Sequence, residues 1–370
     1  MTPVYLYNGQ LRCALGDDLA SASARYRAGQ LPAPQHYVVH ELNEERAFHG
    51  AATCGRSLDD ELAQLLSGCL GDTPGPLDDC LLILASTTLD IQEMEARIAG
   101  GEAFGPQLST ALSRLAERLR ADWGFAAAYT LNTACTSAAN ALLYGARLVG
   151  QGRYRRALVV AFETPSALAM QGFAALGLVS PSGRYRPFHG ERDGLLLGEA
   201  YSAVMLGLEA PAEPLARLLG GFSACDTSNL TTTREDGSHI QWVMQRALDS
   251  ARLSPAQVEL VKLHGTATSA NDIAEANGMQ RMFAATPPPA CVLKPWLGHT
   301  LGACGLSETL LLLDALGKGP LPAVDYAAEA LLALPATPQK LPADALLLSN
   351  FFGFGGNNAS LVLQGVAPCR

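Results

Sequence analysis

One cysteine of the chain stands where its thiol could act as a nucleophile. Cys135 lies in residues 132–141 (NTACTSAANA), where a polar strand end runs directly into an alanine-rich stretch that we expect to be helical. At the first turn of a helix, free backbone N–H groups and the positive end of the dipole stabilise a thiolate and lower the thiol pKa. Taken alone, such a cysteine is more often a small buried core residue, so both interpretations stay open.

Two histidines and a lysine follow in segments that could bind a ligand. His264 comes after the apolar residues 258–261 and precedes a glycine and two hydroxyl residues, at the strand end where open α/β sheets bind ligands. Lys294 and His299 share residues 293–305 (LKPWLGHTLGACG), whose glycines allow close backbone approach. Taken singly, His264 could be a histidine in a turn, Lys294 a lysine at the surface and His299 a histidine at the start of a helix. That interpretation is poor for Lys294 and His299 together in one glycine-rich segment.

A fourth segment, residues 349–358 (SNFFGFGGNN), interleaves glycines with phenylalanines. Such a loop can turn backbone N–H groups towards an oxyanion while aromatic rings wall a tunnel. By itself a glycine-rich loop is weak evidence, because many are only tight turns. The four segments together are far more specific than any one of them.

Alternating strands and helices are predicted to position these segments. Continuous apolar runs, typical of strands covered on both faces, fall at 81–85, 157–161, 202–206, 258–263, 346–348 and 360–363. Helical stretches fall at 59–70, 108–121, 138–148, 240–251, 273–283 and 305–316. This interleaving predicts an α/β protein with a mainly parallel sheet in each of two halves. The Pro- and Glu-containing residues 207–214 suggest a division into 1–207, with the cysteine, and 208–370, with the histidines and lysine.

The overall composition limits the classes of function. The chain has 370 residues, of which 48% are hydrophobic, and it can fill a large core. A formal net charge of −9 and the lack of a Lys/Arg run argue against a nucleic-acid partner. We see no signal peptide and no apolar run of membrane-spanning length. The nine scattered cysteines, never in C-x-x-C spacing, are typical of reduced thiols, so we expect a cytoplasmic protein.

In this order the four segments resemble the β-ketoacyl-acyl carrier protein synthase family of the thiolase superfamily, in its elongating branch with one cysteine and two histidines. That family shows the motifs T-A-C-x-S, H-G-T-x-T, K-x-x-x-G-H-x-x-G-A-x-G and F-G-F-G-G-x-N, and each is present here. The likeness is firm from about residue 120 onwards and faint before it. It implies a thiolase-like fold, with two similar α/β halves packed in five layers (αβαβα), and usually a dimer.

The resemblance also implies roles for four side chains. Cys135 would accept an acyl chain from the thioester of an acyl carrier protein. His264 and His299 would bind the carbonyl of a malonyl thioester, so that loss of carbon dioxide leaves a stabilised enolate to attack the acyl-cysteine. Lys294 would orient and charge the two histidines. The implied activity is a decarboxylative Claisen condensation in fatty-acid, polyene or polyketide biosynthesis.

Further residues take supporting roles by the same resemblance. The N–H groups of Cys135 and Phe354 would form an oxyanion hole, and the Phe354 side chain would gate the acyl tunnel. Thr266 and Thr268 would hold the phosphopantetheine arm of the carrier protein. Glu308 would support the site. No metal or redox cofactor is then required, because release of carbon dioxide drives the reaction.

The chain departs from the family pattern around this set of residues. The part before Cys135 is shorter by a few dozen residues, in a region that usually shapes the acyl tunnel and the dimer surface. The shortening therefore leaves the preferred acyl chain length open. Other departures are Lys262, where a small polar residue is common, Phe351, where Ser is usual, and His189, Pro295, Ala200 and Tyr201. These changes lie around the catalytic residues and not among them, so we expect an unusual substrate or partner rather than lost chemistry.

Three alternatives remain within the same fold. A thiolase would require a second catalytic cysteine in the G-H motif. Cys304 lies in that motif, but at a position usually held by a small residue, and we interpret it as a packing residue. A starter-unit synthase would want Asn in place of one histidine. A chain-length-factor-like subunit, which pairs with a separate ketosynthase and shapes its tunnel, usually lacks the nucleophile that is present here. The expected partners are an acyl carrier protein and a second synthase-like subunit, identical or different; candidates for carrier docking are Arg153, Arg155 and Arg156.

Overall fold

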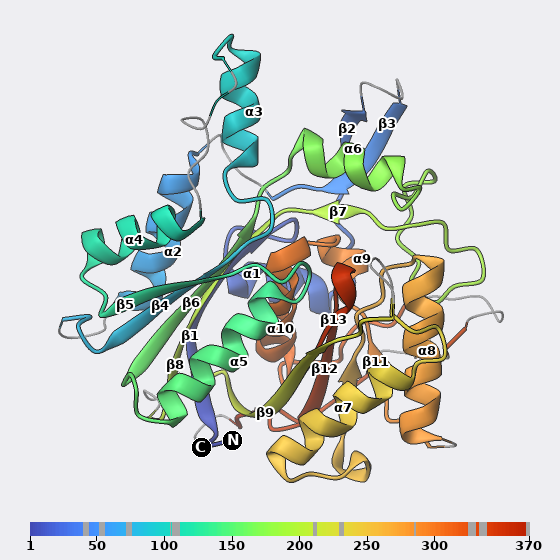
Figure 1. Ribbon diagram of the computed structural model, residues 1–370. Coiled ribbons are helices and arrows are strands. Elements are labelled where there is room, and N and C mark those ends of the chain that lie inside the picture. Colours follow the sequence, from blue (N-terminus) through green and yellow to red (C-terminus); the bar gives the residue numbers. More distant parts are fainter. Residues whose placement is uncertain are drawn as a thin grey trace.

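The computed structural model describes residues 1–39, 44–51, 56–71, 76–103, 105, 112–209, 213–228, 233–284, 286–324, 331–332 and 339–367. A large mixed sheet runs through the molecule (Figure 1). Its strands are β1 (Val4–Cys13), β4 (Cys80–Ala85), β5 (Ala127–Leu131), β6 (Arg156–Glu163), β8 (Ala200–Gly207), β9 (Ala216–Cys225), β10 (Leu260–Lys262), β11 (Ala290–Cys291), β12 (Leu346–Phe352) and β13 (Asn357–Gly365). A smaller sheet contains β2 (Gln35–Val39), β3 (Glu44–His49) and β7 (Leu197–Gly198).

The large sheet contains the same strand arrangement twice. From one edge inward the order is β5-β4-β6-β8-β1, and from the other edge it is β11-β10-β12-β13-β9. In each half the chain starts on the innermost strand, moves out to the edge and returns. The halves join where Val4 of β1 pairs with Leu218 of β9. The expected pair of similar α/β halves is therefore present, whereas a division of the chain at residue 207 stays a prediction.

Helices cover both faces of each half-sheet. They are α1 (Leu19–Arg27), α2 (Leu58–Leu70), α3 (Ile91–Ala99), α4 (Leu112–Trp123), α5 (Ser137–Gly150), α6 (Ala167–Ala175), α7 (Ser238–Ala251), α8 (Ser269–Phe283), α9 (Lys294–Leu297) and α10 (Cys304–Ala315). Short 3-10 turns lie at η1 (Pro255–Gln257), η2 (Leu301–Ala303) and η3 (Phe354–Gly356). Figure 1 shows α2 and α4 outside one half-sheet, α7 and α8 outside the other, and α5 with α10 between them. This is the five-layer arrangement that the resemblance implied.

Burial on both faces explains why the strands are continuous apolar runs. In β4, Leu82 and Leu84 pack into the cluster that holds α2 and α4, while Leu81 and Ile83 pack into the central cluster with α5 and α10. Alternate side chains of one strand thus enter two different cores. All six β4 residues are consequently buried.

The prediction of a mainly parallel sheet in each half is wrong. Strands β4, β5 and β6 are parallel to one another, as are β10, β11 and β12, but β6–β8, β1–β8, β1–β9, β9–β13 and β12–β13 all pair antiparallel. A continuous apolar run reports burial on both faces and not strand direction, so β8 reads like β6 in the sequence. The start of the helix predicted at 108 lies outside the described residues.

Among the described helices, none is long and apolar enough to cross a membrane.

Candidate functional site

Cys135 lies in a tight turn between β5 and α5. Ala134 just before it has a φ of +52°, which is a left-handed conformation that non-glycine residues seldom adopt. Ser137 closes the turn: its hydroxyl accepts from the Thr133 N–H at 2.9 Å and donates to the Ala134 carbonyl at 2.6 Å. The turn therefore fixes the thiol at the N-terminal end of the buried helix α5, close to the predicted position.

Burial has a larger effect on this thiol than the helix end has. It raises the pKa of Cys135 to about 11, although the charge of Lys294 and the backbone N–H of Phe354 act to lower that pKa. The expected lowering of the thiol pKa is therefore wrong. The cause is the depth of the site, because desolvation penalises the charged thiolate more than the neighbouring positive groups favour it.

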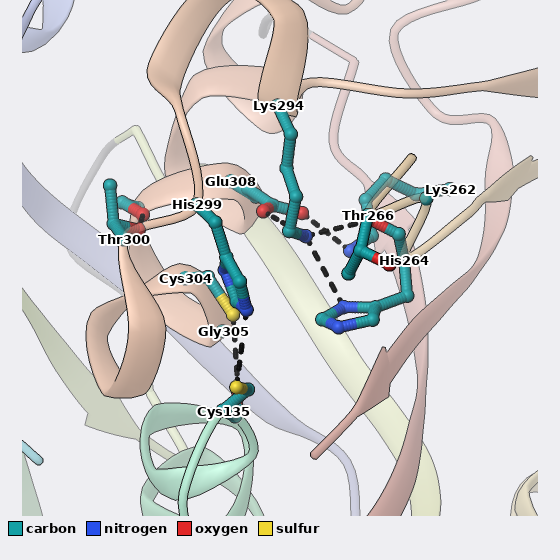
Figure 2. A network of polar contacts seen from close by, with 12 residues as sticks. Cys135, Lys262, His264, Thr266, Lys294, His299, Thr300, Cys304, Gly305 and Glu308 are labelled. Carbon is teal, nitrogen blue, oxygen red and sulfur yellow. Dashed lines mark hydrogen bonds and ion pairs between the residues drawn. The ribbon is translucent and has the colours of Figure 1, made fainter. Parts of the chain in front are cut away.

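His299 is the direct partner of the thiol. Its Nε2 atom lies 3.1 Å from Cys135 Sγ (Figure 2). The backbone of His299 is bonded to the strand segment at β7, where its N–H donates to Leu196 and its carbonyl accepts from Gly198. Burial, followed by the charge of Lys294, holds the pKa of His299 well below its usual range. A neutral imidazole is thus held against the sulfur.

His264 faces the same space from the end of β10. Its ring centroid lies 5.3 Å from that of His299, nearly at a right angle. The backbone N–H groups of His264 and Gly265 donate to the buried Glu275 carboxylate on α8 at 2.8 and 2.9 Å. Burial, then the charges of Lys294 and His299, lower the pKa of His264.

Lys294 connects the two histidines to a buried ionic chain. Its ammonium donates to the His264 carbonyl at 2.7 Å and lies 3.2 Å from His264 Nδ1 (Figure 2). It also pairs with Glu308 at 2.6 Å, and Glu308 pairs with Lys262 at 2.6 Å. Burial acts to lower the pKa of Lys294 and the charge of Glu308 to raise it, and the pKa is raised overall. Since a lysine ammonium only donates, Nδ1 of His264 accepts and its proton lies on Nε2.

One cavity of about 520 Å³ joins these groups. Its walls include Cys135, both histidines, and the predicted pantetheine residues Thr266 and Thr268, whose hydroxyl oxygens are 2.8 Å apart. Phe354 lies at its wall in η3, and its ring stacks on Phe173 with centroids 5.5 Å apart. The structure therefore brings together every residue that the sequence analysis placed in the site. Their roles stay predictions.

Cys304 is fully buried beside the site and does not line this cavity. Its thiol donates to the Cys135 carbonyl at 3.1 Å, and burial raises its pKa (Figure 2). These contacts agree with a packing role. Within the described residues, no group of three or more His, Cys, Asp or Glu side chains is arranged to hold a metal ion.

The three arginines proposed for carrier docking are not at this cavity. Arg153, Arg155 and Arg156 follow the C-terminal end of α5, whereas Cys135 precedes its N-terminal end. Fourteen helical residues span roughly 20 Å. Arg156 is also paired with Asp79 at 2.8 Å. The structure thus gives no support to a docking site there for a carrier arm that reaches Cys135.

Two residues that support the site were missed in the sequence. Glu163, buried at the end of β6, accepts the backbone N–H and hydroxyl of both Thr87 and Thr88, and the N–H of Gly302. It ties the turn after His299 to the first half of the chain. A single carboxylate ending an otherwise apolar strand was the signal available. Phe173, which stacks on Phe354, had no signal in its alanine-rich helix.

Together these groups can carry out acyl transfer. A buried thiol touches a neutral imidazole, a second imidazole presents Nε2–H to the same cavity, and the backbone N–H of Phe354 lies at the sulfur. Such donors stabilise negative charge that develops on a bound carbonyl oxygen.

Comparison with known proteins agrees with this chemistry. The model for the N-terminal domain of β-ketoacyl synthases matches residues 86–212, and that for the C-terminal domain matches residues 215–325. The 3-oxoacyl-(acyl-carrier-protein) synthase 2 of Vibrio harveyi is 30% identical over 256 residues, which are 64% of this chain and 61% of that protein. The chloroplastic synthase I of Arabidopsis thaliana is 28% identical over 264 residues, 65% of this chain and 54% of that protein. The chain thus matches less than two thirds of the length of these relatives.

Solved structures match over nearly the whole chain. A chain of the ketosynthase–chain length factor complex from Xenorhabdus doucetiae is 25% identical, with a TM-score of 0.83 over 99% of this chain and 98% of its own. A β-ketoacyl synthase from Burkholderia phymatum gives a TM-score of 0.84 at 22% identity, over 99% of this chain and all of its own, which bears on the fold alone. The two family models together span more than half of the 370 residues. The chain belongs to the β-ketoacyl synthase family and has its thiolase-like fold.

Proposed function

We propose that the protein is a β-ketoacyl synthase of the Cys-His-His type, which condenses an acyl group on Cys135 with a malonyl unit on an acyl carrier protein. The reaction would serve fatty-acid, polyene or polyketide biosynthesis. The observation that carries the proposal is the convergence of Cys135, His299 and His264 on one cavity, with Sγ and Nε2 3.1 Å apart. The relatives named as 3-oxoacyl synthases support it.

In the first step, Cys135 Sγ attacks the thioester carbonyl of the acyl donor. The thiol proton passes to Nε2 of His299 and then to the departing carrier thiol. The bond to Cys135 forms first and gives a tetrahedral intermediate, from which the C–S bond to the carrier then breaks. The N–H groups of Cys135 and Phe354 stabilise the oxyanion of the tetrahedral intermediate.

Before the second step His299 changes tautomer: its Nδ1 proton leaves to solvent and Nε2 gains one. The malonyl thioester carbonyl then accepts from Nε2–H of His264 and of His299. The bond to the carboxylate breaks, carbon dioxide leaves, and the electron pair forms an enolate. The enolate carbon attacks the acyl-cysteine carbonyl and the C–S bond breaks. The thiolate of Cys135 takes the Nε2 proton of His299, whose Nδ1 regains a proton from solvent. Lys294 keeps His264 in the tautomer that donates, and Thr266 and Thr268 hold the pantetheine arm.

We further propose that this chemistry uses no metal or redox cofactor, because release of carbon dioxide drives it. The proposed compartment is the cytoplasm, where thiols stay reduced. A catalytic thiol requires that state, and the described cysteines, Cys135 among them, are free.

The proposed partner is a second synthase-like chain, identical or a chain length factor. Strand β5 lies at an edge of the large sheet and carries the exposed Tyr129, which lines the same surface hollow as the exposed Tyr144 of α5. An open edge strand with aromatic side chains suits pairing with a second sheet. The Xenorhabdus structure contains a ketosynthase with its chain length factor. Size-exclusion chromatography with light scattering gives the oligomeric state of the chain, both alone and after coexpression with the product of a neighbouring synthase-like gene. A fully active monomer would contradict the proposal.

The test of activity uses purified protein with acyl- and malonyl-carrier substrates. We expect carbon dioxide release and a β-ketoacyl product, which C135A abolishes and C80A, a change at a buried cysteine of β4 that does not line the cavity, leaves unchanged. Product formation by C135A at the wild-type rate would contradict the proposal. If the chain is inactive alone but changes the product length of a coexpressed ketosynthase, it is the chain-length-factor-like subunit instead.

A further inference from the structure

Two lysines share a single carboxylate behind the two histidines. Lys262 Nζ lies 2.6 Å from one oxygen of Glu308, and Lys294 Nζ lies 2.6 Å from the other (Figure 2). All three side chains are completely buried, with 0% exposure. A buried cation is stable only when it is paired and hydrogen-bonded, and one carboxylate cannot neutralise two ammonium groups.

Burial lowers the pKa of Lys262, while the charge of Glu308 acts to raise it. Among the described residues, few other groups can balance the charge of its ammonium form. The Lys262 ammonium lies 3.6 Å from the centroid of the Phe351 ring on β12, which stabilises a cation without neutralising it. The other titratable groups that interact with the two lysines or with Glu308 include Tyr26 of α1, Tyr185, Cys135, Cys291 of β11, Cys304 of α10 and Glu275 of α8. The tyrosines and cysteines are neutral at physiological pH, since burial raises each pKa. Glu275 has a pKa raised by burial to about 7, so near neutral pH it is only partly ionised.

Lys262 is placed so that its charge acts on the two histidines of the site. It is the last residue of β10, two residues before His264. By holding the second oxygen of Glu308, it fixes the carboxylate that holds Lys294, and Lys294 in turn contacts the carbonyl and Nδ1 of His264. Burial is the main cause of the low pKa of both histidines, and the charges of Lys294 and then Lys262 lower it further.

We propose that Lys262 is a positioning residue that acts through Glu308: it completes a buried lysine–carboxylate–lysine chain whose positive charge adds to the effect of burial on His264 and His299 and favours an anion bound between them. Under the proposed function, on which this part rests, that anion is the enolate formed from the malonyl thioester. Two of the positions that depart from the family pattern, Lys262 and Phe351, thereby form one contact, in which the ring stabilises the buried ammonium.

The first test needs no substrate. Histidine-ring NMR titrations between pH 4 and 8 compare the wild type with K262M and K262Q, which remove the charge, and K262R, which keeps it. The matched control is K318M, at an exposed lysine paired with Asp314 on α10. We expect the His264 and His299 titrations to move upward by about one pH unit in K262M and K262Q, the lower end of what a nearby charge causes. K262R and K318M should titrate as the wild type.

The second test separates the two half-reactions. In K262M, malonyl decarboxylation should be about tenfold slower, because a shift of one pKa unit and a tenfold change in rate correspond to the same free energy. Acyl loading of Cys135 should stay within about twofold of the wild-type rate. In K262M, the pH at which decarboxylation is lost on acidification should move upward together with the histidine-ring titrations. In K262R it should equal the wild-type value.

Each outcome decides the proposal. Unchanged ring titrations in the neutral variants would overturn it, and so would an equal loss of loading and decarboxylation with no change in pH profile. If neither K262M nor K262Q folds, Lys262 is a structural ion-pair member and the proposal is wrong. If the wild type does not decarboxylate malonyl thioesters, the proposed function fails, and the ring titrations still decide the role of Lys262.

Discussion

The reactivity of Cys135 towards a neutral alkylating reagent should rise steeply with pH. Burial raises its pKa from an ordinary value near 9 to about 11, so at pH 7 about one thiol in 10⁴ is ionised, against about one in 10² for an ordinary thiol. Because the thiolate is the nucleophile, the alkylation rate should increase about tenfold per pH unit between pH 7 and 10, without a plateau. In K294M the rate should be lower at each pH, since the charge of Lys294 acts to lower the thiol pKa.

The assay is iodoacetamide labelling, with peptide mass spectrometry of each cysteine over time. Cys225 is exposed and provides a reference thiol in the same sample. The slope of the rate against pH is compared, and not its absolute value, because access to the cavity slows Cys135 at every pH. A plateau already at neutral pH would show a preformed thiolate–imidazolium pair with His299. That result would refute the reasoning that burial outweighs the positive groups.

Three further substitutions have distinct expected results. His264→Ala should slow malonyl decarboxylation and condensation by about 10²–10³ while acyl loading continues, measured by carbon dioxide release and intact mass; a wild-type condensation rate would contradict the donor role. Gly305→Ala should destabilise the fold by about 1–3 kcal/mol in chemical denaturation, since a Cβ there would lie 2.3 Å from the Ala139 backbone nitrogen; an unchanged midpoint would show that α10 can shift away from α5. Glu275→Gln should lower the free energy of unfolding by about 1–3 kcal/mol, because one of the two backbone N–H groups at His264 and Gly265 then faces an amide NH₂; an unchanged free energy of unfolding would mean that the loop rearranges.

The residues of the site were predictable because their segments carry chemistry in the sequence. Cys135 lies before an alanine-rich helix, and His264 and His299 each lie next to glycines. The environment that these residues create was not predictable. The thiol pKa depends on the depth of packing between α5 and α10, and on Lys294, which is distant in the sequence. The sequence shows the helix end but not how deeply it is buried.

The layers of the fold were predictable to a similar degree. Most helices were located within a few residues, because apolar spacing and small residues mark α5, α7, α8 and α10. Strand direction was not, because β6 and β8 are both continuous apolar runs although they pair antiparallel. The link from Glu163 to Gly302 also joins residues far apart in the chain, and no local pattern marks such a contact.

The central claim is that Cys135 carries the acyl group, and site-specific acylation tests it most directly. The protein is incubated with an acyl-carrier donor, the intact mass is measured, and the adduct is located by peptide mapping. The account predicts one acyl group on Cys135, lost in C135A and retained in C80A, and released as β-ketoacyl product when malonyl-carrier is added. Stable acylation of another cysteine with Cys135 unmodified would contradict it.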